Sequence, residues 1–195
     1  MVDCSKVGKL IFDLRKEKNM TQKQLAERMN ISDKTISKWE RGFGCPDVSL
    51  LHELSAALNV NIEKILLGDL EPNNMDGGNM KKLKFYMCPN CGNVVTATGE
   101  GEVSCCGRKM AAMVPKPWEG AHDLKVETIE NEYYITFSHE MKKEHYISFI
   151  AYVTYDKVLF TKLYPEQGGE LRIPKLHGGK LYFGCNQHGL WVKKP

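Results

Sequence analysis

Four cysteines in the middle of the chain have the spacing of a metal site. Cys88 and Cys91 form a Cys-x-x-Cys pair, and Gly92 directly after them allows a sharp turn. A short hairpin would return Cys105 and Cys106 to the first pair. Four thiolates in a tetrahedral arrangement select zinc or a single iron. The spacing therefore predicts a metal ion held by four cysteines, in a tetrahedron that the adjacent Cys105 and Cys106 distort.

A second set of potential ligands lies in the C-terminal half. His139 and His145 flank a short loop between two predicted strands, while Cys185 and His188 form a Cys-x-x-His after another strand. His122 lies upstream in a predicted loop. Imidazoles with one thiolate can hold a non-haem iron that keeps a coordination position open. A thiolate opposite that position pushes electron density towards a bound oxygen species, as in thiolate-ligated haem.

Both sets of residues resemble known iron proteins. The strings CGN and CCGRKM are similar to desulforedoxin, whose centre is an iron held by four cysteines. The strings HEMKKEHYISFI and CNQHGLW are similar to desulfoferrodoxin, the two-iron form of superoxide reductase, and this resemblance runs from about residue 84 to 195. It implies an iron with four histidines and one cysteine on an immunoglobulin-like sandwich, and one-electron reduction of superoxide to hydrogen peroxide.

The resemblance also implies a role for each ligand. His139 and His145 match the pair around the methionine loop, and His122 matches the family's first histidine. Cys185 matches the axial thiolate, and His188 matches the last equatorial imidazole. The four-cysteine site would hold a second iron, with zinc as the alternative. This iron, or an external rubredoxin-like donor, would re-reduce the catalytic iron.

The sequence departs from the family at one position that bears on activity. The family usually has a lysine directly before its first histidine, and Ala121 stands there instead. Lys116 or Lys125 could substitute from the same region. Three hypotheses remain open: a superoxide reductase that carries a DNA-binding module, a transcriptional regulator whose iron senses superoxide or redox state, and a zinc-stabilised scaffold.

The N-terminal region predicts a DNA reader. Thr21 and Ser32 are good N-caps for two short helices, Gln22 to Met29 and Asp33 to Arg41, joined by a tight turn. The stretch TQKQLAERMNISDKTISKWERG resembles the lambda-repressor-like, XRE-type helix-turn-helix domain. Its modest charge predicts a homodimer on a palindromic double-stranded operator. The expected DNA contacts are Gln22 to phosphate and, on the second helix, Asp33, Lys34, Thr35, Ser37 and Lys38.

Composition limits the class of protein. The 195 residues carry 27 basic and 24 acidic side chains, a net charge too small to predict nucleic-acid binding by itself. No run approaches the roughly 18 apolar residues of a membrane span, and charges interrupt the N-terminal apolar positions, unlike a secretory signal. We therefore expect a cytoplasmic protein whose cysteines stay reduced, including Cys4 and Cys45 as plain thiols.

The periodicity of the apolar residues changes once along the chain. Residues before the Pro-, Asn- and Gly-rich stretch have helical spacing, and residues after it alternate with a period of two, as in Tyr133, Ile135 and Phe137. This predicts a multidomain α + β chain. The expected parts are a five-helix helix-turn-helix bundle (1–68), a flexible linker (69–82), a desulforedoxin-like metal hairpin (83–115) and a superoxide-reductase-like, iron-binding β-sandwich of immunoglobulin type (116–195).

Overall fold

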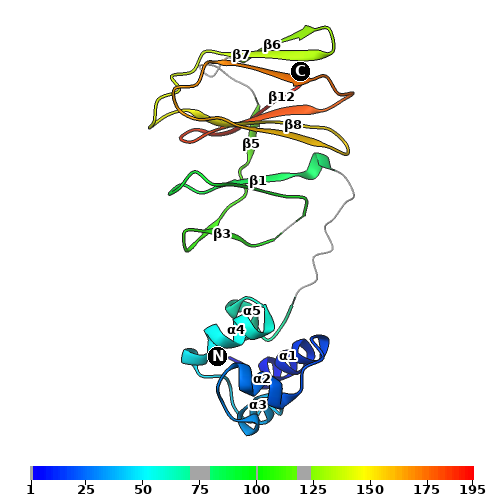
Figure 1. Cartoon of the computed structure of the whole chain (residues 1–195), viewed down its shortest axis with the longest axis vertical. Coiled ribbons are helices and arrows are strands. Elements are labelled where there is room, and N and C mark those ends of the chain that lie inside the picture. Colours follow the sequence, from blue (N-terminus) through cyan, green and yellow to red (C-terminus); the bar gives the residue numbers. More distant parts are fainter. Residues whose placement is uncertain (1, 71–79, 100, 118–123) are drawn as a thin grey trace. The chain divides into compact units, whose positions relative to one another are not determined.

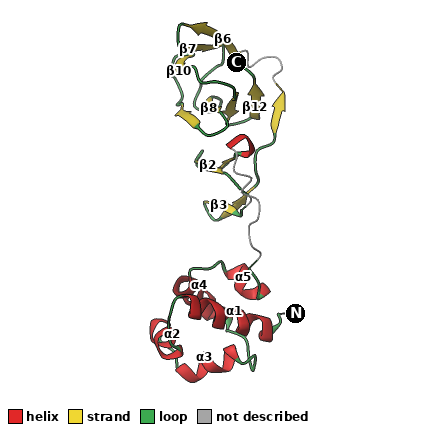
Figure 2. Cartoon of the chain, turned by 90° about the vertical axis from the view of Figure 1, so that its right-hand side faces the viewer, coloured by secondary structure: helices red, strands yellow, loops and turns green. Residues whose placement is uncertain are grey.

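A computed structural model describes residues 2–70, 80–99, 101–117 and 124–195 of the chain (Figure 1). The chain divides into two compact units, Met1–Pro72 and Asn73–Pro195. Figure 2 shows that the first unit is helical and that the second consists of strands and loops with one short helical turn. Among the described residues, no helix combines the length and the apolar character needed to cross a membrane.

The first unit is the five-helix bundle that the sequence predicts. Each helix contributes a completely buried aliphatic residue to one core: Ile11, Leu25, Ile36, Leu54 and Ile65. The helices are α1 (Cys4–Glu17), α2 (Gln22–Arg28), α3 (Asp33–Glu40), α4 (Leu51–Leu58) and α5 (Ile62–Leu67), with a 3-10 turn η1 (Val48–Leu50) before α4.

Capping residues fix where the second and third helices begin. Thr21 and Gln24 form a capping box at the start of α2, in which each side chain accepts a backbone N–H of the other residue. The Ser32 side chain accepts the N–H of Thr35 at the start of α3. Helix α1 packs directly against the end of α3 at Gly8. Any larger residue would clash there, because its Cβ atom would lie 2.0 Å from the Trp39 carbonyl oxygen.

The second unit contains a sandwich of two sheets. Its three-stranded sheet has the order β10-β7-β6, and its five-stranded sheet has the order β5-β12-β11-β8-β9. All neighbouring strands in these two sheets are antiparallel, except that β5 runs parallel to β12. The strands are β5 (Pro115–Pro117), β6 (Leu124–Ile129), β7 (Glu132–Phe137), β8 (Ile147–Val153), β9 (Val158–Lys162), β10 (Glu170–Pro174), β11 (Lys180–Cys185) and β12 (Gly189–Lys193).

Two small hairpins precede the sandwich. The first pairs β1 (Lys84–Met87) with β2 (Val94–Ala97), and the second pairs β3 (Val103–Cys105) with β4 (Arg108–Met110). Phe85 of β1 stacks on Phe149 of the five-stranded sheet, with ring centroids 5.2 Å apart. The other face of that sheet packs in the sandwich, so every residue of β8 is buried.

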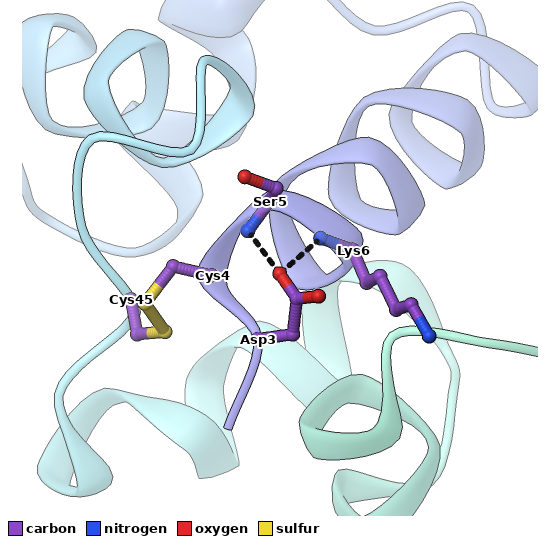
Figure 3. The surroundings of a disulfide bond; sticks show 5 residues. All are labelled: Asp3, Cys4, Ser5, Lys6 and Cys45. Carbon is purple, nitrogen blue, oxygen red and sulfur yellow. Dashed lines mark hydrogen bonds between the residues drawn. A yellow bond between two sulfur atoms is a disulfide. The ribbon is translucent and has the colours of Figure 1, made fainter. Parts of the chain in front are cut away.

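Two sequence expectations need correction here. Residues 80–82, which we expected in the linker, form a 3-10 turn, η2 (Met80–Lys82), and the Met80 N–H donates to the carbonyl oxygen of Tyr155. The rest of the predicted linker lies mostly outside the described residues. The expectation that Cys4 and Cys45 are plain thiols is wrong, because the two residues form a disulfide (Figure 3).

Candidate metal sites and DNA-binding surface

The four predicted cysteine ligands converge at the turns of the two small hairpins. Cys88 and Cys91 lie in the β1–β2 turn, while Cys105 ends β3 and Cys106 follows it in the β3–β4 turn. One sulfur atom from each of the four lies within 4.8 Å of the other three. The Sγ atoms of Cys91 and Cys105 are 3.5 Å apart. Four sulfurs at this spacing suit a tetrahedral metal ion.

Backbone conformation places these cysteines. The Cys88 carbonyl oxygen accepts the N–H of Gly92, whose φ of +67° closes the first turn. In the second hairpin Cys105 pairs with Arg108, which leaves Cys106 and Gly107 as a two-residue loop. Both loop residues have positive φ, as a tight type I′ turn requires. The Cys-Cys-Gly order therefore puts two adjacent sulfurs at the tip of a hairpin.

The thiols at this site affect one another's ionisation. Hydrogen bonds from the backbone N–H groups of Cys91 and Asn90 lower the pKa of Cys88 to about 7. The pKa of Cys91 is raised to about 12, because the three neighbouring thiols raise it more than the backbone N–H of Asn93 lowers it. Ionisation of Cys88 is thus favoured and ionisation of Cys91 is opposed. A bound metal cation would hold all four cysteines as thiolates.

The second set of predicted ligands converges at one end of the sandwich. One ligand atom each from His139, His145 and Cys185 lies within 4.8 Å of the other two. His188 lies beside them, with its Nδ1 atom 3.0 Å from Nε2 of His145 and 3.6 Å from the Cys185 sulfur. The rings of His139 and His145 meet edge to face, with centroids 4.3 Å apart. Three imidazoles and one thiolate therefore share a single small volume.

Strand order explains this convergence. His139 follows β7, His145 precedes β8, and Cys185 ends β11. Because β8 and β11 are antiparallel neighbours, the start of one lies beside the end of the other, and Cys185 pairs with Ile147. The register shifts between Gly184 and Cys185. A side chain at Gly184 would overlap the Phe149 ring, at 2.2 Å, so this glycine permits the close approach.

Asn186 is a structural residue of this site that the sequence analysis missed. Its Oδ1 atom accepts the N–H of Tyr146 at 2.9 Å, and its Nδ2 atom donates to the Glu144 carbonyl oxygen at 3.0 Å. These bonds join the turn that carries Cys185 and His188 to the loop that carries His145. The available signal was an asparagine between two potential ligands in a tight turn, a residue type whose side chain bonds nearby backbone.

Burial sets the chemistry of the thiol in this site. Burial raises the pKa of Cys185, although the backbone N–H groups of Gln187 and His188 act in the opposite direction. A thiolate at a completely buried position needs a nearby positive charge. The Met141 N–H donates to Nδ1 of His139 at 3.4 Å, and Nε2 of His139 is itself shielded from solvent. The buried sulfur and nitrogen donors are consistent with a metal site.

The structure does not test the predictions made for the first histidine and the residues around it. His122 and Ala121 lie outside the described residues. Lys116 lies in β5 opposite Trp191, and Lys125 lies in β6 opposite Thr136. The roles proposed for these four residues therefore stay predictions.

The predicted DNA contacts lie on and beside α3. Asp33, Lys34 and Lys38 are exposed, whereas Thr35 and Ser37 are half-buried. The hydroxyls of Ser32 and Thr35 lie 2.9 Å apart at the helix start. Ile36 and Trp39 are buried on the opposite face. The exposed face of α3 thus carries two lysines and short polar side chains, as a helix that enters a DNA groove requires.

A buried ion pair holds α3 in place. The Arg15 guanidinium of α1 contacts both carboxylate oxygens of Glu40, at 2.5 and 2.8 Å, and also donates to the Met20 carbonyl oxygen. The Gln22 amide donates to Glu40 at 2.7 Å. This bond uses one of the two hydrogens of the Gln22 amide, and the predicted contact of Gln22 with phosphate stays a prediction.

Comparison with known proteins separates the same two regions. A helix-turn-helix family model matches residues 11–65. The HTH-type transcriptional activator BcrR of Enterococcus faecalis is 39% identical over 79 residues, which cover 38% of this chain and 38% of that protein. The chain thus spans well under half the length of that activator, and the similarity concerns the helical unit.

The C-terminal region matches desulfoferrodoxins over almost their whole length. A desulfoferrodoxin of Syntrophotalea carbinolica is 32% identical over 120 residues, which cover 57% of this chain and 95% of that protein. The crystal structure of a superoxide reductase from Treponema pallidum has a TM-score of 0.50 and 20% identity, over 57% of this chain and 98% of that one. At that identity the structural match concerns the fold alone.

Proposed function

Because the chain belongs to the desulfoferrodoxin family, we propose that its β unit is a superoxide-reductase-like iron protein joined to a sequence-specific DNA-binding unit. The observation that carries the proposal is the convergence of His139, His145 and His188 on the buried sulfur of Cys185. His122 would supply the fourth imidazole. The reaction would be conversion of superoxide, one electron and two protons into hydrogen peroxide.

The donor set fits iron. Imidazoles with one thiolate suit a non-haem iron with an open position, and Cys185 is buried where a thiolate needs a cation. Iron bound there would supply the electron that reduces superoxide. Asn186 keeps the Cys185–His188 turn and the His145 loop in register, so the ligands would be ordered before metal binds.

The loop between His139 and His145 carries charges of both signs beside the site. Lys142 and Lys143 are exposed in the loop between His139 and His145, although Lys142 also pairs with Glu140 at 3.0 Å. That ion pair lowers the pKa of Glu140, so the carboxylate stays charged and offsets part of the lysine charge. Glu144 of the same loop is also exposed, so the two lysines are balanced by two carboxylates, and any attraction of superoxide by this loop would be local to Lys143.

The four-cysteine site would hold a second iron, or zinc. Its cysteines come from two hairpins that share few buried residues, so the metal would fix these hairpins to each other. An iron there could also pass electrons to the catalytic iron. The alternative is that an external rubredoxin-like donor reduces the catalytic iron. Zinc would provide only the structural role.

The helical unit would bring the protein to a double-stranded DNA operator, as a homodimer. The exposed face of α3 supplies the base contacts, and the lysines beside it contact phosphates. We propose that Asp33, Lys34, Thr35, Ser37 and Lys38 form this surface.

A sensing role is the second candidate, and the presence of Ala121 in place of the family's usual lysine favours it. A regulator would change oxidation state with superoxide but would turn over slowly. In this case the iron site would report the redox state to the DNA-binding unit.

One experiment separates these functions. Reduced, iron-loaded protein is mixed with superoxide, and hydrogen peroxide is measured against superoxide consumed, with an excess of electron donor. A reductase gives equal amounts and repeats the cycle, whereas dismutation gives half as much peroxide. The proposal requires His139→Ala to abolish the reaction and His177→Ala, at an exposed histidine, to preserve it. A single stoichiometric oxidation without repetition would favour the sensor.

A further inference from the structure

The Cys4–Cys45 disulfide joins two parts of the DNA-reading unit that are distant in sequence. Cys4 is the first residue of α1, and Cys45 lies in the segment between α3 and η1, with a separation of 41 residues. Both cysteines are partly exposed, so small oxidants and reductants can reach them. Figure 3 shows the bond beside the capped start of α1.

The segment attached to Cys45 touches the predicted DNA-reading helix. The Phe43 N–H donates to the Lys38 carbonyl oxygen at 3.0 Å. A Cβ atom on Gly44 would lie 3.3 Å from the Lys38 side chain, so this segment packs along that lysine. On the other side, a Cβ atom on Gly42 would lie 2.8 Å from the Ser5 hydroxyl of α1. The disulfide therefore holds the segment between the start of α1 and a proposed DNA contact.

The two sulfurs are positioned to react with each other. Cys4 is the first residue of α1, and its Cα atom lies 4.9 Å from that of Cys45. Asp3 accepts the N–H groups of Ser5 and Lys6 at this terminus and so fixes the backbone that carries Cys4 (Figure 3). Cys45 would therefore be the thiol that reacts with an oxidised Cys4.

We propose that Cys4 and Cys45 form a reversible dithiol–disulfide pair that hydrogen peroxide oxidises, and that the disulfide holds the helical unit in its DNA-binding conformation. The inference rests on the proposed function in one respect: superoxide reduction by the β unit would supply the peroxide. The dithiol–disulfide pair itself does not depend on that activity. Peroxide diffuses, so the inference requires no contact between the two units.

The oxidation step balances in atoms and electrons. The Cys4 thiolate attacks one oxygen of hydrogen peroxide, the O–O bond breaks, and sulfenic acid forms as hydroxide leaves and takes up the proton that the Cys4 thiol had lost, giving water. The Cys45 thiol then attacks the Cys4 sulfur, an S–S bond forms as the S–O bond breaks, and the hydroxyl leaves with the Cys45 proton as a second water. The two thiols lose two electrons and two protons, and one hydrogen peroxide becomes two waters. A thiol reductant such as glutathione reverses the step and becomes the disulfide itself.

Reduction should loosen the DNA reader without unfolding its core. Opening a disulfide with this sequence separation should lower the melting temperature of a domain of this size by about 15–30 °C. The segment after α3 would then become mobile beside Lys38. Ordering it on DNA carries an entropic cost that the oxidised protein avoids, so reduction should weaken DNA binding by about fivefold.

The first test follows the thiols of the full-length protein directly. Reduced protein receives hydrogen peroxide, and peptide mass spectrometry measures the Cys4–Cys45 link against dimedone-labelled sulfenic acid. The wild type should form the link, Cys45→Ser should accumulate dimedone on Cys4, and Cys4→Ser should form neither product. A link that resists glutathione, or that peroxide does not restore, overturns the proposal.

The second test measures DNA affinity in both redox states. The probe is a duplex that the oxidised protein selects from a library of random sequences. Reduction should weaken binding to this duplex, and peroxide should restore it. The Cys4→Ser/Cys45→Ser double variant should bind weakly in both conditions. Equal affinities of the reduced and oxidised wild type, or tighter binding after reduction, overturn the proposal.

A superoxide source distinguishes this inference from the proposed function. Superoxide also dismutates spontaneously to peroxide, so the wild type is compared with His139→Ala at the same superoxide flux and with an excess of electron donor. If added peroxide forms the disulfide but superoxide forms it equally in both proteins, the pair is confirmed and peroxide production by the β unit is not. If the wild type forms it faster than His139→Ala and catalase removes the difference, both are supported. If neither oxidant forms the link, the inference fails whatever the β unit does.

Discussion

The hydroxyl of Ser148 lies 3.3 Å from the sulfur of Met87 and 3.0 Å from the Gly184 carbonyl oxygen. Met87 directly precedes the ligand Cys88, and Gly184 directly precedes Cys185. Ser148 itself is completely buried in β8. One polar side chain therefore touches the strands that lead to both candidate metal sites, and these two sites belong to a single packed body.

Removal of the Ser148 hydroxyl should destabilise this body. In Ser148→Ala the Gly184 carbonyl oxygen loses its side-chain donor in a buried location, and the free energy of unfolding of the β unit should fall by about 1–3 kcal/mol. Chemical denaturation of the metal-loaded protein measures the change. Thr128→Val removes an exposed hydroxyl from β6 as a control and should change stability by less than about 0.5 kcal/mol. Equal effects of the two substitutions would contradict the role given to Ser148.

Local spacing predicted much of the four-cysteine site, because its ligands come from two short hairpins. Cys88 and Cys91 are close in sequence, and the glycine after Cys106 indicates a tight turn. The resemblance to desulfoferrodoxin supplied the second set, whose members come from three strands. Spacing alone could not predict that set, because it depends on which strands are neighbours in the sheet.

Pairings between residues far apart in sequence could not be predicted from local spacing. The Cys4–Cys45 bond depends on how α1 packs against the end of α3, and neither cysteine belongs to a recognisable motif. The hydrogen bond from Gln22 to Glu40 depends on the same packing. Both pairings join side chains whose partners lie far away in sequence, and local spacing does not indicate such partners.

The Arg15–Glu40 ion pair should be essential to the helical unit. Their side chains are only 4% and 3% exposed, so Arg15→Met leaves a buried carboxylate without its main partner. The free energy of unfolding should fall by about 3–5 kcal/mol. Arg15→Met/Glu40→Leu removes both charges and should recover much of that loss.

Far-UV circular dichroism during denaturant unfolding measures these changes. The exposed pair Lys23–Glu27 provides a matched control, and Lys23→Met should cost less than about 0.5 kcal/mol. If the Arg15 variant is as stable as the Lys23 variant, the pair does not organise the bundle. A double variant that is less stable than Arg15→Met would contradict the explanation by an isolated buried charge.

Two side chains of α3 should carry part of the DNA affinity. Thr35→Ala and Lys38→Ala should each weaken specific binding by about 1–3 kcal/mol if they contact base edges. Fluorescence anisotropy with a selected duplex measures the loss at fixed salt concentration. Lys9→Ala removes the same charge from an exposed position of α1 and should have a smaller effect. Unchanged affinity in both α3 variants would exclude this face as the reader.

Iron content and the visible spectrum of anaerobically purified protein test the central claim most directly. Wild-type protein should contain iron and, when oxidised, show thiolate-to-iron charge transfer from the β unit. Cys185→Ser should remove the band of the histidine–cysteine site, whereas His177→Ala should leave the spectrum and the iron content unchanged. A Cys185→Ser spectrum identical to that of the wild type would contradict the assignment of this sulfur and its three histidine neighbours as the iron site.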